Sequence, residues 1–234
     1  MPNIHILAED VRNKIAAGEV IERPASVVKE LVENAIDAGA DNIIVAIENG
    51  GKDLIRVIDN GYGMNADDAM LAFERHSTSK IKRVEDIIHI SSLGFRGEAL
   101  PSIASVSKLH LVTRTAEEEM ATIVEYANGK LINVTKTAAN IGTAVTVRGL
   151  FKDLPARRKF LKTAQVEARH ILKYIHYQAL VYPQISFRLV IEDKEKLNYI
   201  ACAERKQRIE EVFGGGFFED DIIPIEGKYS DYSI

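Results

Sequence analysis

Cysteine is almost absent from the 234-residue chain, which contains only Cys202. A single cysteine excludes a disulfide within the chain and a multi-cysteine metal site, and we expect its small apolar side chain in the core. This usage is typical of a reducing cytosol and predicts a cytoplasmic protein. The chain also lacks an apolar run of the roughly 20 residues that cross a bilayer. Its first residues, Met1-Pro2-Asn3, lack the layout of a signal peptide.

An excess of charge of one sign is missing too. The formal net charge is −4, with 27% charged and 46% hydrophobic residues, which is typical of a globular protein rather than a disordered chain. Because the whole chain is not a polycation, any contact with nucleic acid requires a local basic patch. The length suffices for one sizeable core and the beginning of a second.

Two common nucleotide-binding patterns are absent. The P-loop pattern GxxxxGK[ST] does not occur, and Gly61-x-Gly63 lacks the third glycine of GxGxxG. A nucleotide, if it binds, must therefore be held in another way.

Apolar periodicity and turn signals predict helices and strands that are joined mainly through hairpins, such as the one at Asn49-Gly50-Gly51. Helices are predicted at about 24–38, after Met64, from 98, at about 166–181, and between Cys202 and Gly214. Strands are predicted near 43–47, 54–58, 108–113, 121–126, 131–135, after Gly142-Thr143, and near 185–191 and 197–200. The expected fold is α+β, a two-layer sandwich of a mixed, mostly antiparallel sheet with helices on one face.

The chain is expected to divide near Cys202. Residues 1–202 are predicted to form the first domain. Residues 203–234 are too few to bury a core of their own, although Asp221–Ile225 has the pattern of a strand. We therefore interpret residues 203–234 as the truncated beginning of a second α/β domain.

A polar face is predicted on the first helix. Glu30, Asn34 and Asp37 follow at steps of four and three, so they share one side of it. An amide oxygen and phosphate oxygens are sufficient ligands for Mg²⁺, and a carboxylate one turn away can orient or deprotonate a water. The alternative is an ordinary solvated helix face.

A second polar motif, Asp59-Asn60-Gly61-Tyr62-Gly63, follows a predicted strand directly. A carboxylate at the end of a strand can accept a hydrogen bond from an exocyclic amine such as that of adenine. The glycines let the backbone approach a flat ligand closely. The alternative is a plain Asp-Asn-Gly turn.

A third motif, Gly94-Phe95-Arg96-Gly97-Glu98, leads into a predicted helix. Such a glycine-bracketed loop presents free N–H groups and the positive end of the helix dipole to a phosphate, and Arg96 can add positive charge. The alternative is a simple junction between a loop and a helix.

Residues 152–173 are strongly basic. Such a segment can neutralise phosphates without reading bases, or it can be a solvated helix face. It contains seven cations, Lys152, Arg157, Arg158, Lys159, Lys162, Arg169 and Lys173, against two acids, Asp153 and Glu167. The six histidines show no metal-ligand spacing and are expected to be structural or on the surface.

The order of the motifs resembles one ATPase superfamily, which includes gyrase-type topoisomerases, a heat-shock chaperone, histidine kinases and MutL. Its successive nucleotide motifs match ELVENAIDA at 30–38, DNGYGM at 59–64, LGFRGEAL at 93–100 and Gly142-Thr143. Within the superfamily the resemblance is to the MutL family of DNA mismatch repair proteins. It is carried by IAAGEV at 15–20, RPASVVKEL at 23–31, RHSTSKI at 75–81 and PARRKFL at 155–161. The resemblance is strong from about residue 4 to 162.

This resemblance implies a Bergerat-type ATP-binding fold and a role for each matching residue. Glu30 would be the general base, and Asn34 would bind Mg²⁺. Asp59 would bind adenine. The other residues implied near ATP are Asp37, Gly61, Gly63, Met64, Thr78, Ser79, Lys80, Gly94, Phe95, Arg96, Gly97 and Thr143. The residues expected to contact DNA are Arg157, Arg158, Lys159 and Lys162.

The family also implies an ATP-gated switch that pairs as a homodimer on binding ATP, in the cytoplasm of a bacterium and near its nucleoid. The implied partners are a MutS-type mismatch sensor, DNA, and a downstream nuclease or helicase. A phosphate-sensing lysine would lie in a ribosomal protein S5-like second domain beyond Ile234. We therefore expect residues 1–234 alone to stay monomeric, to hydrolyse little ATP and to be mobile around 77–95. The chain departs from the family pattern at Ser77, usually alanine, and at Asp153, where asparagine is expected.

Two alternative functions compete with this one. Another enzyme of the superfamily, a topoisomerase or a kinase subunit, would need strings that are not seen here, or a phosphoacceptor-histidine hairpin before the ATP motifs. A non-catalytic nucleotide-gated binding module would not need Glu30 beside the metal ligand. Phosphate release by the protein with its whole second domain would distinguish the two.

Overall fold

The computed structural model describes residues 17–18, 20–75, 77 and 97–214, together with the backbone of two short strands near the C-terminus. Its helices are α2 (Pro24–Asp37), the 3-10 turn η1 (Asn49–Gly51), α3 (Ala66–Leu71), α4 (Ala99–Ser105), α5 (Pro155–Phe160), α6 (Ala164–Val181) and α7 (Arg205–Phe213). Its strands are β1 (Asn42–Glu48), β2 (Leu54–Asp59), β3 (Lys108–Arg114), β4 (Ala121–Ala127), β5 (Lys130–Thr137), β6 (Gly142–Arg148), β7 (Ser186–Ile191), β8 (Lys194–Tyr199), β9 (Lys228–Tyr229) and β10 (Tyr232–Ser233).

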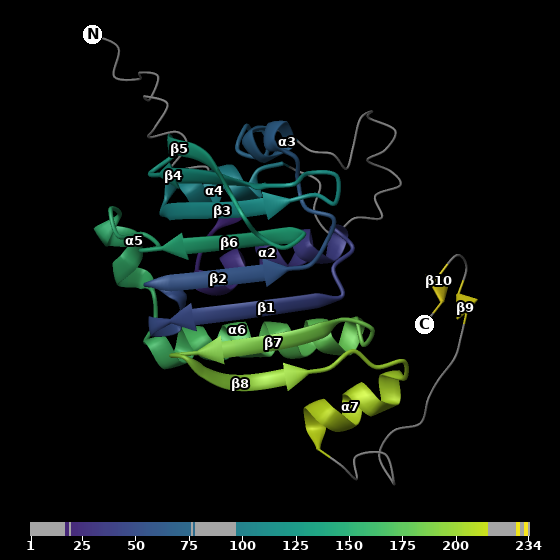
Figure 1. Cartoon of the computed structure of the whole chain (residues 1–234). Helices are drawn as coiled ribbons and strands as arrows, with labels where there is room; N and C mark the ends of the chain where they lie inside the picture. Colours follow the sequence, from purple (N-terminus) through teal and green to yellow (C-terminus); the bar gives the residue numbers. More distant parts are fainter. Residues whose placement is uncertain are drawn as a thin grey trace.

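The strands β1 to β8 form one sheet in the order β5-β4-β3-β6-β2-β1-β7-β8 (Figure 1). All neighbouring pairs in this sheet are antiparallel except β1 and β7, which run parallel. The predicted mixed, mostly antiparallel sheet is confirmed. So is the hairpin at Asn49-Gly50-Gly51, which joins β1 to β2 through a 3-10 turn.

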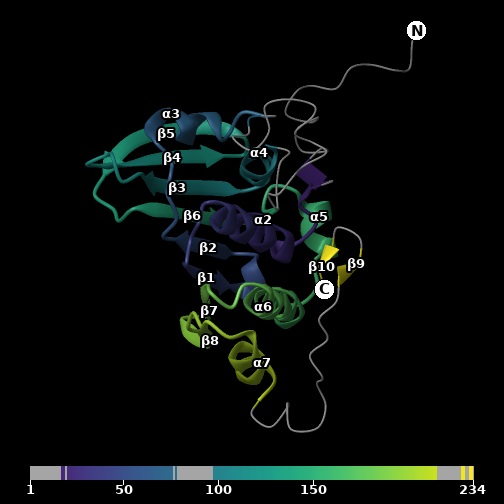
Figure 2. The same ribbon diagram turned by 90° about the vertical axis from the view of Figure 1, so that its right-hand side faces the viewer.

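The helices α4, α2 and α6 lie along one face of this sheet, which confirms the two-layer sandwich (Figure 2). Alternation within β1 explains the layering. Ile43, Val45 and Ile47 are buried against the helices, whereas Ile44 and Ala46 lie on the opposite face and are half-buried. Burying the first set stabilises the fold by roughly 1.5–3 kcal/mol for each large aliphatic side chain.

The helix α2 matches the predicted helix closely. Pro24 occupies its first turn, where a missing N–H costs nothing, and Gly39 follows its end with a positive φ of 70°. Its buried face holds Pro24, Val27, Val28, Leu31, Val32 and Ala35. This face fixes the rotation of α2 and hence the side on which its polar residues lie.

The basic segment contains a short helix that the sequence analysis did not predict. The six residues of α5 begin at Pro155 and bury none of their side chains fully, so no apolar periodicity marks this helix. The helix α6 begins after the cap residue Thr163, whose side chain accepts a hydrogen bond from the N–H of Val166. Within its first turn, Glu167 is fully buried.

The last described helix, α7, is held to the end of α6 and to the residues before β7 and after β8 by Arg208, whose side chain is fully buried. Its guanidinium donates to four backbone oxygens, those of Ala179, Pro183, Ile185 and Ile200. Cys202 is buried, as predicted. The predicted strand at Asp221–Ile225 lies outside the described residues, and the domain boundary near Cys202 stays a prediction.

Candidate functional site

Three polar side chains lie in one row where β2, β6 and β3 meet. Asp59 pairs with Thr143 across β2 and β6, and Thr143 pairs with Thr113 across β6 and β3. In each strand this position lies two residues from a buried apolar residue and so on the same side, which faces the helices. The hydroxyls of Thr113 and Thr143 lie 3.0 Å apart. The row is therefore a polar floor at an otherwise apolar interface between the sheet and the helices.

Asp59 holds this floor together through one carboxylate oxygen. Its Oδ1 accepts hydrogen bonds from the backbone N–H groups of Gly61 at 2.9 Å and Thr143 at 3.2 Å. Burial raises the pKa of Asp59, and these two hydrogen bonds oppose the rise. Its Oδ2 makes no hydrogen bond to any described residue, so it can accept one from a ligand.

The second motif packs against the C-terminal end of α2. The N–H of Tyr62 donates to the carbonyl oxygen of Ala38 at 3.0 Å. A Cβ at Gly61 would come within 2.6 Å of the same oxygen. Glycine at this position therefore allows the turn after β2 to touch the helix that carries the first motif.

The end of the second motif reaches β3 and β6. Gly63 has a φ of 70°, and a Cβ there would overlap the carbonyl oxygen of Arg114. The N–H of Met64 donates to the Thr113 hydroxyl at 2.8 Å. The predicted residues Asp59, Gly61, Gly63, Met64 and Thr143 are thus brought together.

Glu30, Asn34 and Asp37 are half-buried along one side of α2, as their spacing predicts. Tyr174 of α6 lies near Glu30: burial raises the pKa of Tyr174, and the charges of Glu33 and Glu30 raise it further. The Tyr174 hydroxyl donates to the carbonyl oxygen of Lys29 at 3.4 Å. Glu30 is thus half-buried rather than on a fully solvated face.

The third motif is described only at its end. Gly97 has a φ of 60°, and a Cβ there would overlap the backbone of Ser77. Gly97 and Ser77 therefore lie in close contact. The other predicted residues of these two segments lie outside the described residues, namely Thr78, Ser79, Lys80, Gly94, Phe95 and Arg96.

The donor set around α2 suits a magnesium ion that is held mainly by phosphates. Among the described residues, no group of three or more His, Cys, Asp or Glu side chains could hold a metal ion. Asn34 carries an amide oxygen, the ligand type that such an ion takes, one turn of helix away from Glu30. A hard cation that retains several waters needs few protein ligands when phosphate oxygens supply the others.

The four predicted DNA-contacting residues fall into two pairs. Arg157 is half-buried and stacks over the ring of Phe151, with its Cζ 5.6 Å from the ring centroid. Arg158 donates to Asp53 at 3.0 Å. Lys159 and Lys162 are exposed and have no ion-pair partner among the described residues. The structure therefore leaves the two lysines most accessible to a polyanion.

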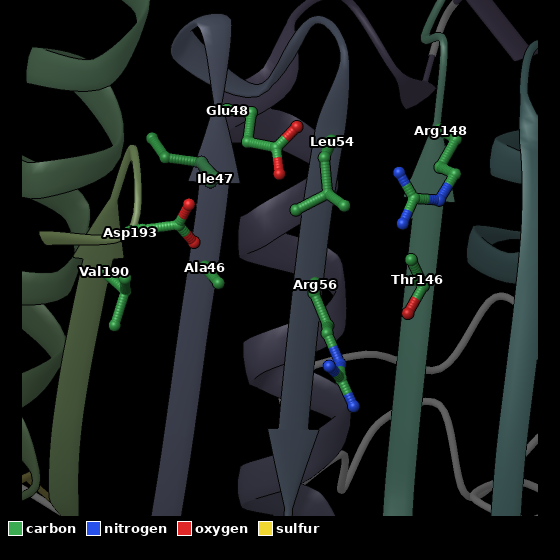
Figure 3. Close-up of a pocket in the computed structure, with 9 residues that line it drawn as sticks. All are labelled: Ala46, Ile47, Glu48, Leu54, Arg56, Thr146, Arg148, Val190 and Asp193. Atoms are coloured by element: carbon green, nitrogen blue, oxygen red, sulfur yellow. The ribbon is translucent and has the colours of Figure 1, made fainter.

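A shallow depression of about 250 Å³ lies on the opposite face of the sheet (Figure 3). Arg56, Thr146 and Arg148 line one side of it, and Glu48 and Asp193 line the other. None of the predicted nucleotide residues lines it. The polar floor, rather than this depression, is the candidate nucleotide site, because the predicted motifs converge there.

Two residues of the site were missed by sequence reasoning. Thr113 is a polar residue at a core-facing position of β3, between Leu111 and the end of the strand, and that misplaced polarity is a usable signal. Tyr174 lies on the long helix α6, and nothing in its local pattern indicates a neighbour on α2. Asp153, the unusual residue before Pro155, accepts a hydrogen bond from Asn128 at 2.8 Å.

Comparisons with known proteins identify the family of the chain. A sequence profile described as "Histidine kinase-, DNA gyrase B-, and HSP90-like ATPase" matches residues 21–146. "DNA mismatch repair protein MutL" of Solibacter usitatus is 52% identical over 220 residues, covering 94% of this chain and 33% of that protein. The protein of the same name from Koribacter versatilis is 50% identical over 228 residues, covering 97% of this chain and 35% of that protein. The chain spans about a third of the length of these curated relatives.

Solved structures show the same similarity. The "Aquifex aeolicus MutL ATPase domain complexed with ADP" is 39% identical with a TM-score of 0.68, covering 83% of this chain and 70% of that one. The "Crystal Structure of N terminal domain of a DNA repair protein" is 31% identical with a TM-score of 0.73, covering 87% of this chain and 60% of that one.

Proposed function

This chain belongs to the MutL proteins of DNA mismatch repair and carries their ATPase domain, and we propose that it binds and hydrolyses ATP on the polar floor formed by β2, β6 and β3. The observation that carries the proposal is the convergence of Asp59, Thr143 and the turn at Gly61 on the end of α2. The ADP complex of the Aquifex aeolicus domain supports the nucleotide class.

Adenine would bind against Asp59. Its exocyclic amine is a donor, and the Oδ2 atom of Asp59 is an acceptor that the described residues leave unused. The Thr143 and Thr113 hydroxyls would contact the same ring or a water beside it. Because the other oxygen of Asp59 is already held by two backbone N–H groups, the carboxylate is oriented before the ligand arrives.

The phosphates would extend along α2. Glu30 would orient and deprotonate the attacking water, and Asn34 would hold Mg²⁺ together with phosphate oxygens. The ion, when bound, neutralises charge on the phosphates. Gly97, with Gly94, Phe95 and Arg96, would contact phosphate, and Thr78, Ser79 and Lys80 would form a lid. These last roles come from the resemblance to the family.

The biological role we propose is that of an ATP-gated switch in the bacterial cytoplasm. ATP binding would order the lid and pair two copies, and hydrolysis would separate them. The proposed partners are a MutS-type mismatch sensor and a downstream nuclease or helicase. The family membership supports this role, and so does the single buried cysteine, which suits a reducing compartment. Among the described helices, none is both long and apolar enough to cross a bilayer.

The proposed contact with DNA lies at α5 and the start of α6. Lys159 and Lys162 are exposed there, as are Lys152 and Arg169. Exposed lysines bind phosphates without reading bases, so the contact would not depend on sequence.

Phosphate release by the full-length protein tests the proposal. ATP binding and phosphate release should both depend on Mg²⁺. Both should be lost when Asp59 is replaced by asparagine. ATP binding without release would instead favour a nucleotide-gated module that does not catalyse. A protein that binds no adenine nucleotide at all would refute the proposed site.

A further inference from the structure

Two arginine contacts hold the segment that leads into α2. Arg23, the residue before the helix, pairs with Glu167 of α6, with its Nε 3.2 Å from one carboxylate oxygen and its Nη2 3.3 Å from the other. Arg157 of α5 lies against Gly18, which belongs to the turn that precedes Arg23 and α2. Both contacts come from residues 155–167, within the basic segment 152–173.

The contact between Arg157 and Gly18 is so close that a side chain at residue 18 would require the Arg157 guanidinium to move. The three atoms nearest to such a Cβ all belong to the Arg157 guanidinium. The guanidinium also lies over the ring of Phe151, which is only 1% exposed. Arg157 is therefore sandwiched between a core aromatic ring and the Gly18 backbone.

The Nη1 atom of Arg157 is buried and has no hydrogen-bond partner among the described residues. An unsatisfied buried donor costs roughly 1–3 kcal/mol, so stability alone does not account for an arginine at this position. The flat guanidinium fills the narrow space between Phe151 and Gly18, which a lysine ammonium cannot do. The geometry thus favours a positional role.

The helix α2 is held differently at its two ends. Its C-terminal end is fixed by the hydrogen bond from Tyr62 to Ala38, next to the polar floor. Its N-terminal end depends on the preceding turn, where the N–H of Ile21 bonds to the Ala17 carbonyl oxygen, and on the two arginine contacts. A shift of this turn would move Glu30 more than Asn34, because Glu30 is one helical turn closer to the N-terminal end of α2.

We propose that Arg157 is a positioning residue for ATP hydrolysis: by packing on Gly18 it sets the approach to α2 and hence the place of Glu30. The inference rests on the ATPase function proposed above. It gives the first arginine of the basic segment an internal role and leaves contact with DNA to the exposed lysines. Removing the contact should lower kcat while the affinity for ATP, which depends on Asp59, changes little.

The test uses the full-length protein and two opposite changes to one contact. Arg157→Ala removes the guanidinium, whereas Gly18→Ala leaves it in the chain but pushes it out of its place. Each should lower kcat about tenfold, because small displacements of a catalytic group are costly. The KM for ATP should change less than about threefold. The double variant should be no slower than the slower single variant, because both changes break the same contact.

Two further variants separate this role from others. Arg188→Ala removes an exposed arginine on β7, distant from α2, and should leave kcat unchanged. Arg157→Lys keeps the charge but not the flat shape, so it should not restore kcat.

Four outcomes would overturn the proposal: full activity of Arg157→Ala; full activity of Gly18→Ala; multiplicative losses in the double variant; or weaker DNA binding by Arg157→Ala with normal kcat. A loss of kcat that accompanies a lowered Tm and a raised KM would indicate a merely structural role and would also overturn it. If the wild-type protein released no phosphate, the proposed function would fail instead.

Discussion

Asp59 and Thr143 face each other across β2 and β6, and the backbone N–H of Thr143 donates to the Asp59 carboxylate at 3.2 Å. The same oxygen also accepts the N–H of Gly61. One carboxylate oxygen thus serves the fold, and the other remains for a ligand. The structural role of Asp59 and its role in ligand binding can therefore be tested separately.

Replacing Asp59 with asparagine should abolish ATP binding without unfolding the protein. The amide oxygen of Asn can still accept from Gly61 and Thr143, but its NH₂ group would face the donor amine of adenine. We expect at least a hundredfold loss of affinity, on the order of 3 kcal/mol. Isothermal titration with ATP measures the loss, and far-UV circular dichroism checks the fold. Retained affinity would place adenine elsewhere.

The same substitution should stabilise the empty protein at neutral pH. Burial raises the pKa of Asp59 above its ordinary value of 3.8, so the folded state disfavours the charged form. A raised pKa in an acid contributes stability that is present below the unfolded pKa and is lost as pH rises through the folded pKa. The Tm of Asp59→Asn should therefore exceed that of the wild type at pH 7, with a gap that narrows as the pH falls toward 4. A gap that is constant with pH would argue against the raised pKa.

Glu30→Ala should retain ATP binding and lose hydrolysis. A general base acts only in the chemical step, and removing one costs roughly a hundredfold or more in rate. Glu33→Ala is the matched control, since Glu33 lies on the same helix and pairs with Lys29 at 3.8 Å. Single-turnover phosphate release in the full-length protein measures both. Equal rates of phosphate release in the two variants would mean that Glu30 is not the general base.

Asn34→Ala should weaken the binding of ATP in the presence of Mg²⁺. The amide oxygen of Asn34 is the protein ligand that we assign to the ion, so its loss should affect binding rather than only the rate. Comparing ATP affinity with Mg²⁺ and with EDTA isolates this contribution. We expect the difference between the two conditions to shrink in the variant. An undiminished difference would mean that another residue holds the ion.

Lys159→Glu combined with Lys162→Glu should weaken DNA binding equally for all sequences. If each lysine neutralises one phosphate, the slope of log K against log salt should become shallower by about 2. Lys194→Glu with Lys196→Glu, on the exposed strand β8, is the charge-matched control. Fluorescence anisotropy at several salt concentrations gives both values. An unchanged slope in the Lys159→Glu, Lys162→Glu variant would mean that these lysines are solvated and do not contact DNA.

Much of the fold was predictable because its signals are local. The face of α2, its proline start and the glycine after it all follow from periodicity and backbone preference. The hairpins were predictable for the same reason, since their turn residues are a local signal in the sequence. The pairing of β1 with β7 was not predictable from such signals, because a parallel pair joins segments that are far apart in the sequence.

The candidate site also contains residues that the sequence predicts and residues that it does not. Asp59 and Asn34 are recognisable because each lies within a continuous motif. Thr113, Tyr174 and the contact between Arg157 and Gly18 arise only when distant segments meet. The role of Arg157 illustrates the limit, because composition indicates a positive surface whereas packing places the guanidinium against Phe151.

The parallel pairing of β1 with β7 has a consequence for how the protein is made. When β2 has left the ribosome, Asp59 has already been made. Thr143, the partner of Asp59, is 84 residues later in the chain. The second neighbour of β1 is later still, at residues 186–191. The nascent β1–β2 hairpin must therefore keep both of its outer strand edges unpaired while the middle of the chain is translated. Closing such distant contacts slows folding, and ATP cannot assist the early stages because its pocket is completed late.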